Sequence, residues 1–260
     1  YVGALLQQLY TENKLQNTAL VLGNEALLIP ILNSIPSSIE DINITMGLPL
    51  KQIPFSAFID QWFHLHKDPS PLYYYQDVIG VLSHQFVRPL FQTEDQDAAQ
   101  LIMTTIKQQN LISLSKDQII AIAPDHKENL ELLFETWNDQ PTNAIESVLS
   151  LIFKLKDHYN KSKNKHLLAL EYLYRFSEIF NHLQRLNTRY SYITNIKVLQ
   201  SIYKELLSLE TLDFKGQPLK GLQIMGMLES RVLDFETVII VSVNEGVLPA
   251  GKTNNSFIPF

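Results

Sequence analysis

The chain has 260 residues, of which 45% are hydrophobic, and its formal net charge is −6. This length and apolar content suffice for one large domain or two ordinary ones. The negative charge argues against a general nucleic-acid coat protein. Cysteine is absent, which excludes disulfides and cysteine-based metal sites and fits a reducing, cytoplasmic compartment.

Membrane and export signals are missing from the sequence. No run of 18 or more apolar residues occurs, so we expect no membrane-spanning segment and no membrane partner. The first residues lack a basic stretch followed by an apolar core, so we expect no signal peptide. The chain starts without Met and stops at Phe260 inside an apparent loop, so we expect a piece of a longer protein.

The first 66 residues alternate between helical and extended patterns. Apolar side chains at helical spacing predict helices, and short β-branched runs predict buried strands. In chain order we expect a helix over 2–15, a strand over 19–22, a helix over 25–34, a strand over 42–46 and a helix over 55–66. Pro30 should kink the second helix or shift its start.

The middle of the chain has a different character. Lys67–Pro71 forms a linker-like break. Apolar stripes then predict successive helices over 73–86, 95–109, 127–137, 143–159, 166–185 and 195–208. No fixed repeat period is present, so we do not expect a regular solenoid.

Two apolar runs near the end of the chain, Leu222–Leu228 and Thr237–Val243, have the length and β-branched content of buried strands. A polar stretch, Glu229–Phe235, separates them, and Asn244–Gly246 follows the second run. In open α/β sheets, ligands bind at the carboxyl ends of parallel strands. Both polar stretches are therefore candidate site loops.

This stretch resembles the fifth conserved motif of UvrD/Rep-type helicases of superfamily 1, and it is most similar to their AddB-like helicase–nuclease branch. Arg231 stands where that motif has lysine, and Asp234 stands where it has glutamate. Leu228 replaces a histidine, and Val232 replaces a glycine. The positions that keep the pattern are Gln223, Met225, Ser230, Leu233, Phe235, Glu245, Gly246 and Pro249.

The resemblance implies an α/β fold of the P-loop NTPase type, the RecA-like second motor domain with its parallel sheet. That domain is expected to be discontinuous, over 1–66 and 211–260, with an all-helical insertion over 67–210. The longer chain would be a bacterial DNA repair and recombination protein, with the ATP-binding domain upstream and a PD-(D/E)XK nuclease downstream. ATP and Mg would be cofactors of that longer chain, and none is expected in this part.

The resemblance also assigns roles to the polar hinge. Arg231 would form a forked contact with a phosphate of single-stranded DNA, with Ser230 donating to the same backbone and Glu229 beside them. Asp234 would accept a hydrogen bond from a nucleotide ribose. In an alternative interpretation, Arg231 forms an ion pair with Glu229 or Asp234 that only fixes the loop. We expect no catalytic residue and no metal ligand in this part of the protein.

A further position bears on nucleotide binding. The turn after the first strand is similar to the fourth helicase motif, where UvrD-like motors carry an arginine that reaches ATP. Gly23 occupies that place here, beside Asn24 and Glu25. Three functions stay open: a degenerate motor domain that binds single-stranded DNA or docks a second helicase–nuclease subunit, part of an active ATP-dependent translocase, and a structural scaffold without DNA contact.

Several patterns have simpler interpretations. Gly246–Thr253 matches the phosphate-loop pattern GxxxxGK[ST], but no helical pattern comes after it, as such a loop requires. Pro124-Asp125 and Asp213–Lys215 match pieces of the nuclease motif, but several predicted helices separate them, so coincidence is the preferred interpretation. Residues 154–166 carry a local charge of +4; a solvated turn is the preferred interpretation, and a contact with backbone phosphates is the alternative.

Aromatic residues and histidines add one more pair of alternatives. Trp62-Phe63 and Tyr73–Tyr75 have the chemistry to stack on bases, but aromatic side chains within helical stripes are typical of a core. The seven histidines include no pair four residues apart on a predicted helix, so we do not expect a zinc site.

Overall fold

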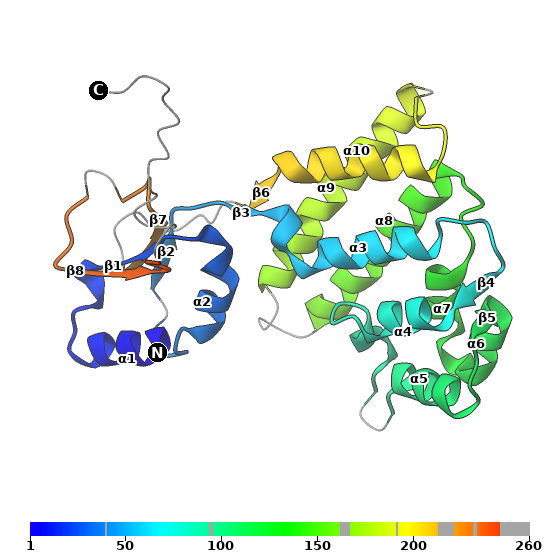
Figure 1. Cartoon of the computed structure of the whole chain (residues 1–260), viewed down its shortest axis with the longest axis horizontal. Helices are drawn as coiled ribbons and strands as arrows, with labels where there is room; N and C mark the ends of the chain where they lie inside the picture. The colour runs from blue at the N-terminus through cyan, green and yellow to red at the C-terminus, as the bar shows by residue number, and fades with distance from the viewer. Residues whose placement is uncertain are drawn as a thin grey trace, which may run out of the picture. The chain divides into compact units, whose positions relative to one another are not determined.

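The structure is a computed structural model that describes residues 1–39, 41–93, 96–161, 167–190, 192–212, 221–230 and 233–244. It divides into two compact units, shown in Figure 1. The first, which we call the sheet unit, combines Tyr1–Leu48 with Thr211–Phe260. The second, the helical unit, is Pro49–Glu210. The sheet unit is discontinuous, as we expected from the sequence, but its first segment ends at residue 48 rather than at residue 66.

The sheet unit contains a four-stranded parallel sheet with the order β2-β7-β1-β8. Its strands are β1 (Thr18–Leu22), β2 (Ile42–Ile44), β7 (Leu222–Gly226) and β8 (Thr237–Val241). β7, from the end of the chain, lies between β1 and β2, from its beginning. The prediction that the two ends of the chain share one parallel sheet is confirmed, and so is the mixed α/β class.

The central strands β1 and β7 are buried along their whole length. This explains why neither strand alternates regularly between apolar and polar residues, since a parallel strand covered on both faces is largely apolar throughout. One polar pair is buried with them: Asn43 Nδ2 donates to Gln223 Oε1 over 2.7 Å, across 180 residues of sequence. Gln223 Nε2 also donates to the Gly221 carbonyl at 3.1 Å. These bonds satisfy amide groups that would otherwise destabilise the core.

Helices α1 (Val2–Thr11) and α2 (Leu28–Ser34) lie on the same side of the sheet in Figure 1. Pro30 lies in the first turn of α2, where a missing N–H costs no helical hydrogen bond, so it shifts the start of the helix instead of kinking it. The opposite face has a small apolar cluster, with Met227 and Phe235 packed against Ala19, Val21 and Met225. Two short 3₁₀ turns, Leu15–Asn17 and Glu25–Leu27, flank β1.

The helical unit follows the predicted succession of helices, with two additions. A short antiparallel pair, β4 with β5, and the helix α6 were not predicted. Strands β3 (Leu48–Pro49) and β6 (Thr211–Leu212) pair where the chain leaves the sheet unit and returns. The remaining elements are 3₁₀ turns at Leu50–Gln52, Arg88–Phe91 and Pro124–His126, with α3 (Pro54–Leu65), β4 (Leu72–Tyr74), α4 (Tyr75–Ser83), α5 (Ala98–Gln108), β5 (Ser113–Ser115), α6 (Lys116–Ile122), α7 (Lys127–Phe134), α8 (Pro141–Lys161), α9 (Leu167–Arg189) and α10 (Ile196–Leu209).

Helix α3 belongs to the helical unit because its aromatic side chains form that unit's core. The ring of Phe55 lies 5.0 Å from that of Phe176 on α9, and Trp62 lies 5.3 Å from Trp137. Burial of such large rings stabilises a fold by several kcal/mol in total, which explains the displaced boundary. Trp62 and Phe63 are therefore core residues, and the alternative that they stack on bases is not supported.

The carboxyl end of α7 is closed by side chains from α3 and β4. The last carbonyls of a helix have no partner within the helix. Here Trp62 Nε1 and His66 Nε2 each lie 2.9 Å from the Leu133 oxygen, and Tyr73 Oη donates to the Phe134 oxygen at 2.7 Å. His66 must carry a hydrogen on Nε2 to donate this bond. Burial lowers the pKa of His66 to about 4, although its bond to the carbonyl and nearby Glu135 act in the opposite direction.

The helical unit should lose stability as the pH falls below neutrality. An unfolded histidine has a pKa of about 6.5. Between pH 7.5 and 5, His66 is therefore protonated in the unfolded chain but stays neutral in the folded chain. The free energy of unfolding should fall by about 2 kcal/mol from this residue alone. Urea titrations followed by the fluorescence of Trp62 and Trp137 would measure it.

His66→Gln is the matched control, because it keeps an amide donor and removes the titrating ring. Its pH dependence should be weaker by the same 2 kcal/mol, as a rough figure. Some dependence should persist, because burial also lowers the pKa of His84. An equally steep loss of stability in both proteins would contradict this assignment.

Two glycines at the ends of β7 should tolerate substitution very differently. Gly221 has φ +71°, and a Cβ there would lie 2.0 Å from the Asp41 carbonyl oxygen. At Gly226 a Cβ would instead meet the movable carboxylates of Glu229 and Glu25. We expect Gly221→Ala to destabilise the sheet unit by about 1–3 kcal/mol and Gly226→Ala to cost much less. Hydrogen exchange of the β1 and β7 amides would report this directly, and equal exchange in both variants would contradict it.

Candidate functional site at the carboxyl edge of the sheet

Three strands end at the same level of the sheet. Leu22 is paired in register with Gly226 on one side and with Val241 on the other. The segments after β1, β7 and β8 therefore leave the sheet at one edge, as in the α/β sheets that bind ligands at their carboxyl ends. This carboxyl edge contains Gly23–Glu25, Met227–Ser230 and Ser242–Asn244, and both candidate loops from the sequence begin here.

Two carboxylates converge above the end of β7. A Cβ built on Gly226 would lie 2.4 Å from Glu229 Oε2 and 3.0 Å from Glu25 Oε1. Both side chains are exposed. No third carboxylate or histidine joins them within the described ranges, and hard cations take six or more oxygen ligands. The pair makes this edge locally negative, which opposes a phosphate unless a cation lies between them.

Gly23 packs against the backbone of the neighbouring strand. Its amide donates to the Val241 carbonyl at 3.0 Å. A Cβ at this position would lie 2.9 Å from that same oxygen and 3.2 Å from the Ser242 oxygen. Any side chain at position 23 thus requires the backbone after β8 to move. The position expected to hold an ATP-contacting arginine in UvrD-like motors is therefore closed by packing here.

The predicted hinge residues lie in different environments. Ser230 Oγ donates to the Met227 carbonyl at 2.8 Å, so its hydroxyl hydrogen is used inside the turn. Glu229 and Asp234 are both exposed to solvent. Arg231, with Val232, lies outside the described residues. Its phosphate contact and its alternative ion pair with Glu229 or Asp234 both remain predictions.

Other positions from the resemblance are structural in this chain. Met225 and Phe235 belong to the apolar cluster on the sheet, and Gln223 holds the buried amide pair described above. Leu228, at the histidine position, is 66% exposed. The positions 245, 246 and 249, the whole GxxxxGK[ST] stretch and the Asp213–Lys215 fragment lie outside the described residues.

The basic segment over 154–166 is engaged locally where it is described. Lys154 Nζ lies 2.7 Å from Glu128, and Lys161 Nζ lies 2.8 Å from Asp157. Lys156 Nζ donates to Ser177 Oγ at 3.0 Å and also lies over the Tyr174 ring. These contacts favour the interpretation of a solvated, self-paired surface. The remaining lysines, at 163 and 165, lie outside the described residues.

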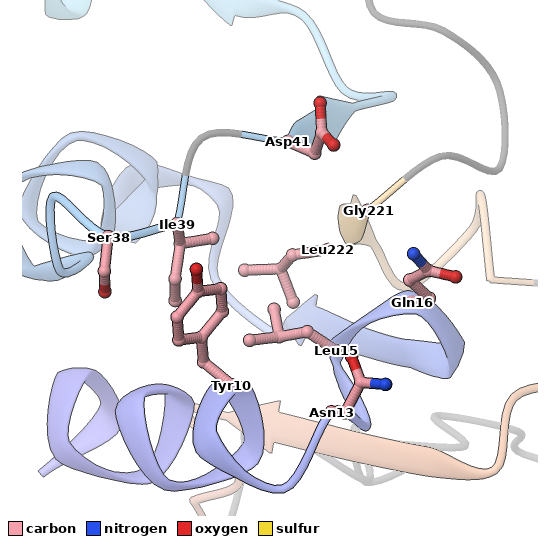
Figure 2. A pocket seen from close by; sticks show the side chains of 9 residues that line it. All are labelled: Tyr10, Asn13, Leu15, Gln16, Ser38, Ile39, Asp41, Gly221 and Leu222. Carbon is pink, nitrogen blue, oxygen red and sulfur yellow. The ribbon is translucent and has the colours of Figure 1, made fainter.

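A hollow of the sheet unit lies at the other edge, where β1 and β7 begin. It has a volume of 340 Å³, and Figure 2 shows the Tyr10 ring standing in it between Ser38 and Leu15. Asn13, Gln16 and Asp41 add polar groups to its rim. Ligands of parallel sheets bind at the carboxyl ends of the strands. This hollow lies at the opposite edge from the candidate site loops, so we do not assign it to the candidate site.

Comparison with models of known protein families gives no match for the sequence, and comparison with curated proteins gives no relative. Among the helices that the structure describes, none combines the length and apolar composition needed to cross a bilayer. The function of this chain must therefore be inferred from its residues and their geometry.

Proposed function

We propose that the chain is a RecA-like second motor domain of an AddB-like, superfamily 1 helicase–nuclease, interrupted by a helical insertion. The observation that carries this proposal is the insertion of β7 between β1 and β2. The helicase-like motif begins on β7. Because β7 lies beside β1, the polar hinge after β7 and the turn after β1 lie at the same edge of the sheet. This convergence is what a site shared between DNA and nucleotide requires.

Within that class, we propose a binding platform for single-stranded DNA rather than a working ATPase. Gly23 leaves no room for an arginine beside the nucleotide, and Glu25 and Glu229 make the edge negative. A triphosphate carries a dense negative charge, so it would be repelled more strongly than a DNA backbone held by Arg231 through a single forked contact. An active translocase would need its catalytic charges and its ATP and Mg from other parts of a longer chain.

Arg231→Ala should weaken the binding of single-stranded DNA. Loss of a charge-assisted contact of about 1.5–3 kcal/mol corresponds to at least a tenfold increase in Kd. The slope of log K against log salt should fall by about one, because one phosphate contact disappears. Fluorescence anisotropy of a labelled oligothymidylate at several salt concentrations would measure both quantities.

Two variants separate a phosphate contact from a structural ion pair. If Arg231 binds phosphate, Arg231→Lys keeps part of the affinity, and Glu229→Gln increases affinity by removing a repulsive charge. If Arg231 instead pairs with Glu229 to fix the loop, Glu229→Gln weakens the fold of the loop and does not improve binding. Wild-type affinity in Arg231→Ala would exclude the proposed DNA contact.

A second candidate function is docking of a partner subunit, favoured by one surface feature. Among the strands that the structure describes, β8 lies at the edge of the sheet, and its alternate residues Val238 and Ile240 point to one face. They are 51% and 45% exposed, although neighbouring Ala19 and Val21 on that face are buried. Exposed apolar side chains at a sheet edge are typical of an interaction surface.

If β8 docks the second helicase–nuclease subunit, the double variant Val238→Lys/Ile240→Lys should abolish their association. Co-purification of the two full-length proteins would measure it. The double variant should keep its fold, because both side chains are already half exposed. Lys substitution of Leu101, an exposed residue on α5, is the matched control and should leave association unchanged. Retained association in the β8 variant would exclude this surface.

A further inference from the structure

Helix α9 carries a row of basic side chains that ends in an exposed aromatic pair. Arg175, His182, Arg185 and Arg189 succeed one another at intervals of three, four or seven residues, so they share one face of the helix. The first three line a groove of 420 Å³ against the end of α10. None of these residues was singled out by the sequence analysis, although the helical spacing was visible there.

The aromatic pair lies directly after the helix. The rings of Tyr190 and Tyr192 are stacked, with centroids 5.6 Å apart and an angle of 11° between their planes. Tyr192 is 75% exposed and Tyr190 is 40% exposed. The Arg189 guanidinium lies 5.4 Å from the centre of the Tyr190 ring. Two parallel, solvated rings beside a cation present a flat π surface that nothing in the described chain covers.

The charges of the groove are unevenly distributed. Arg175 is already engaged, with Glu171 at 3.2 Å and Glu178 at 3.5 Å, and Glu210 lines the same end. Toward the tyrosines, Arg185 has no ion-pair partner among the residues that the structure describes, and the contact of Arg189 is with an aromatic ring. The cationic surface open to a ligand therefore runs from Arg185 to the tyrosine pair.

We propose that this surface binds single-stranded nucleic acid, with phosphates at Arg185 and Arg189 and a base stacked on Tyr192. The two arginines are one helical turn apart, about 6 Å along the axis, which suits neighbouring phosphates of an extended strand. Base stacking on aromatic rings next to a positive groove is the chemistry by which proteins hold single strands. An acidic peptide would use the cations but would leave the flat ring surface unused.

This site lies on the helical unit and does not depend on the hinge after β7. The two proposals can therefore fail separately. Binding lost in Arg231→Ala but unchanged in the α9 variants would overturn this inference and keep the proposed function. The opposite pattern would keep the α9 surface and remove the hinge.

The test is the binding of the full 260-residue chain to fluorescein-labelled oligothymidylate and oligouridylate of about 16 nucleotides, followed by anisotropy. Tyr192→Ala should weaken binding about 5- to 100-fold, and Tyr192→Phe should retain it because the ring surface persists. Arg185→Glu should weaken binding and reduce the salt slope by at least about one. Tighter binding of one oligomer identifies DNA or RNA as the preferred strand.

Matched controls exist elsewhere in the helical unit. Phe153→Ala removes a 74% exposed ring from α8, and Lys67→Glu makes the same charge change as Arg185→Glu at an exposed position. Both should leave the affinity within about twofold of wild type. Losses in the controls equal to those in the α9 variants, or no binding by the wild type, would overturn the proposal.

Photocrosslinking gives a readout that a merely structural role would not produce. An oligonucleotide with 5-bromouracil in place of thymine should crosslink to the tyrosine pair, because photoexcited bromouracil takes an electron from an electron-rich ring in contact with it and joins that ring through C5 with loss of HBr. Mass spectrometry of the digested complex should place the link at Tyr190 or Tyr192. A crosslink found only in the sheet unit would overturn the proposal.

Discussion

β7 holds the sheet unit together through its hydrogen bonds to both neighbouring strands. Without β7, β2 would have no partner in the sheet and β1 would pair with β8 alone. A strand that joins segments about 180 residues apart closes a long loop, and such closure costs entropy that only many simultaneous contacts offset. The complete burial of β7 and the Asn43–Gln223 amide bond supply those contacts. The helical unit is therefore an insertion that the sheet tolerates, because its two connecting segments pair as β3 and β6.

The same pairing decides what the carboxyl edge contains. The strands β1, β7 and β8 are paired in a register in which they end at the same height. As a result, Glu25 lies near Glu229, and Gly23 packs against the backbone at the end of β8. An edge with two carboxylates and no room for a side chain at position 23 is poorly suited to polyphosphate chemistry. It is compatible with a contact that depends on one arginine, or with a surface that serves association. These physical features, more than the motif substitutions themselves, favour a platform over a motor.

The helical unit depends on a different interaction, the closure of the carboxyl end of α7 by buried aromatic side chains. Trp62, His66 and Tyr73 all bond to carbonyls at the end of α7. This fixes α3 within the unit and leaves the face of α9 that holds Arg185 and Arg189 on the outside. When such a cationic and aromatic surface lies on a packed helix, less conformational entropy is lost in ordering the protein side of the interface on binding. The two units thus present separate surfaces with different chemistry.

Elements whose physical signal is local could be predicted from the amino-acid sequence. Short, largely apolar runs marked β1, β7 and β8, helical stripes marked most of the helices, and together they indicated a split parallel sheet. α6 was missed because its seven residues are too few to show a period. The place of α3 in the helical unit emerged only from the folded chain, since burial of Phe55 and Trp62 depends on partners more than 70 residues away. Folding likewise brought Glu25 to Glu229 and left Tyr190 and Tyr192 exposed, because proximity and exposure arise from packing, which no local pattern encodes.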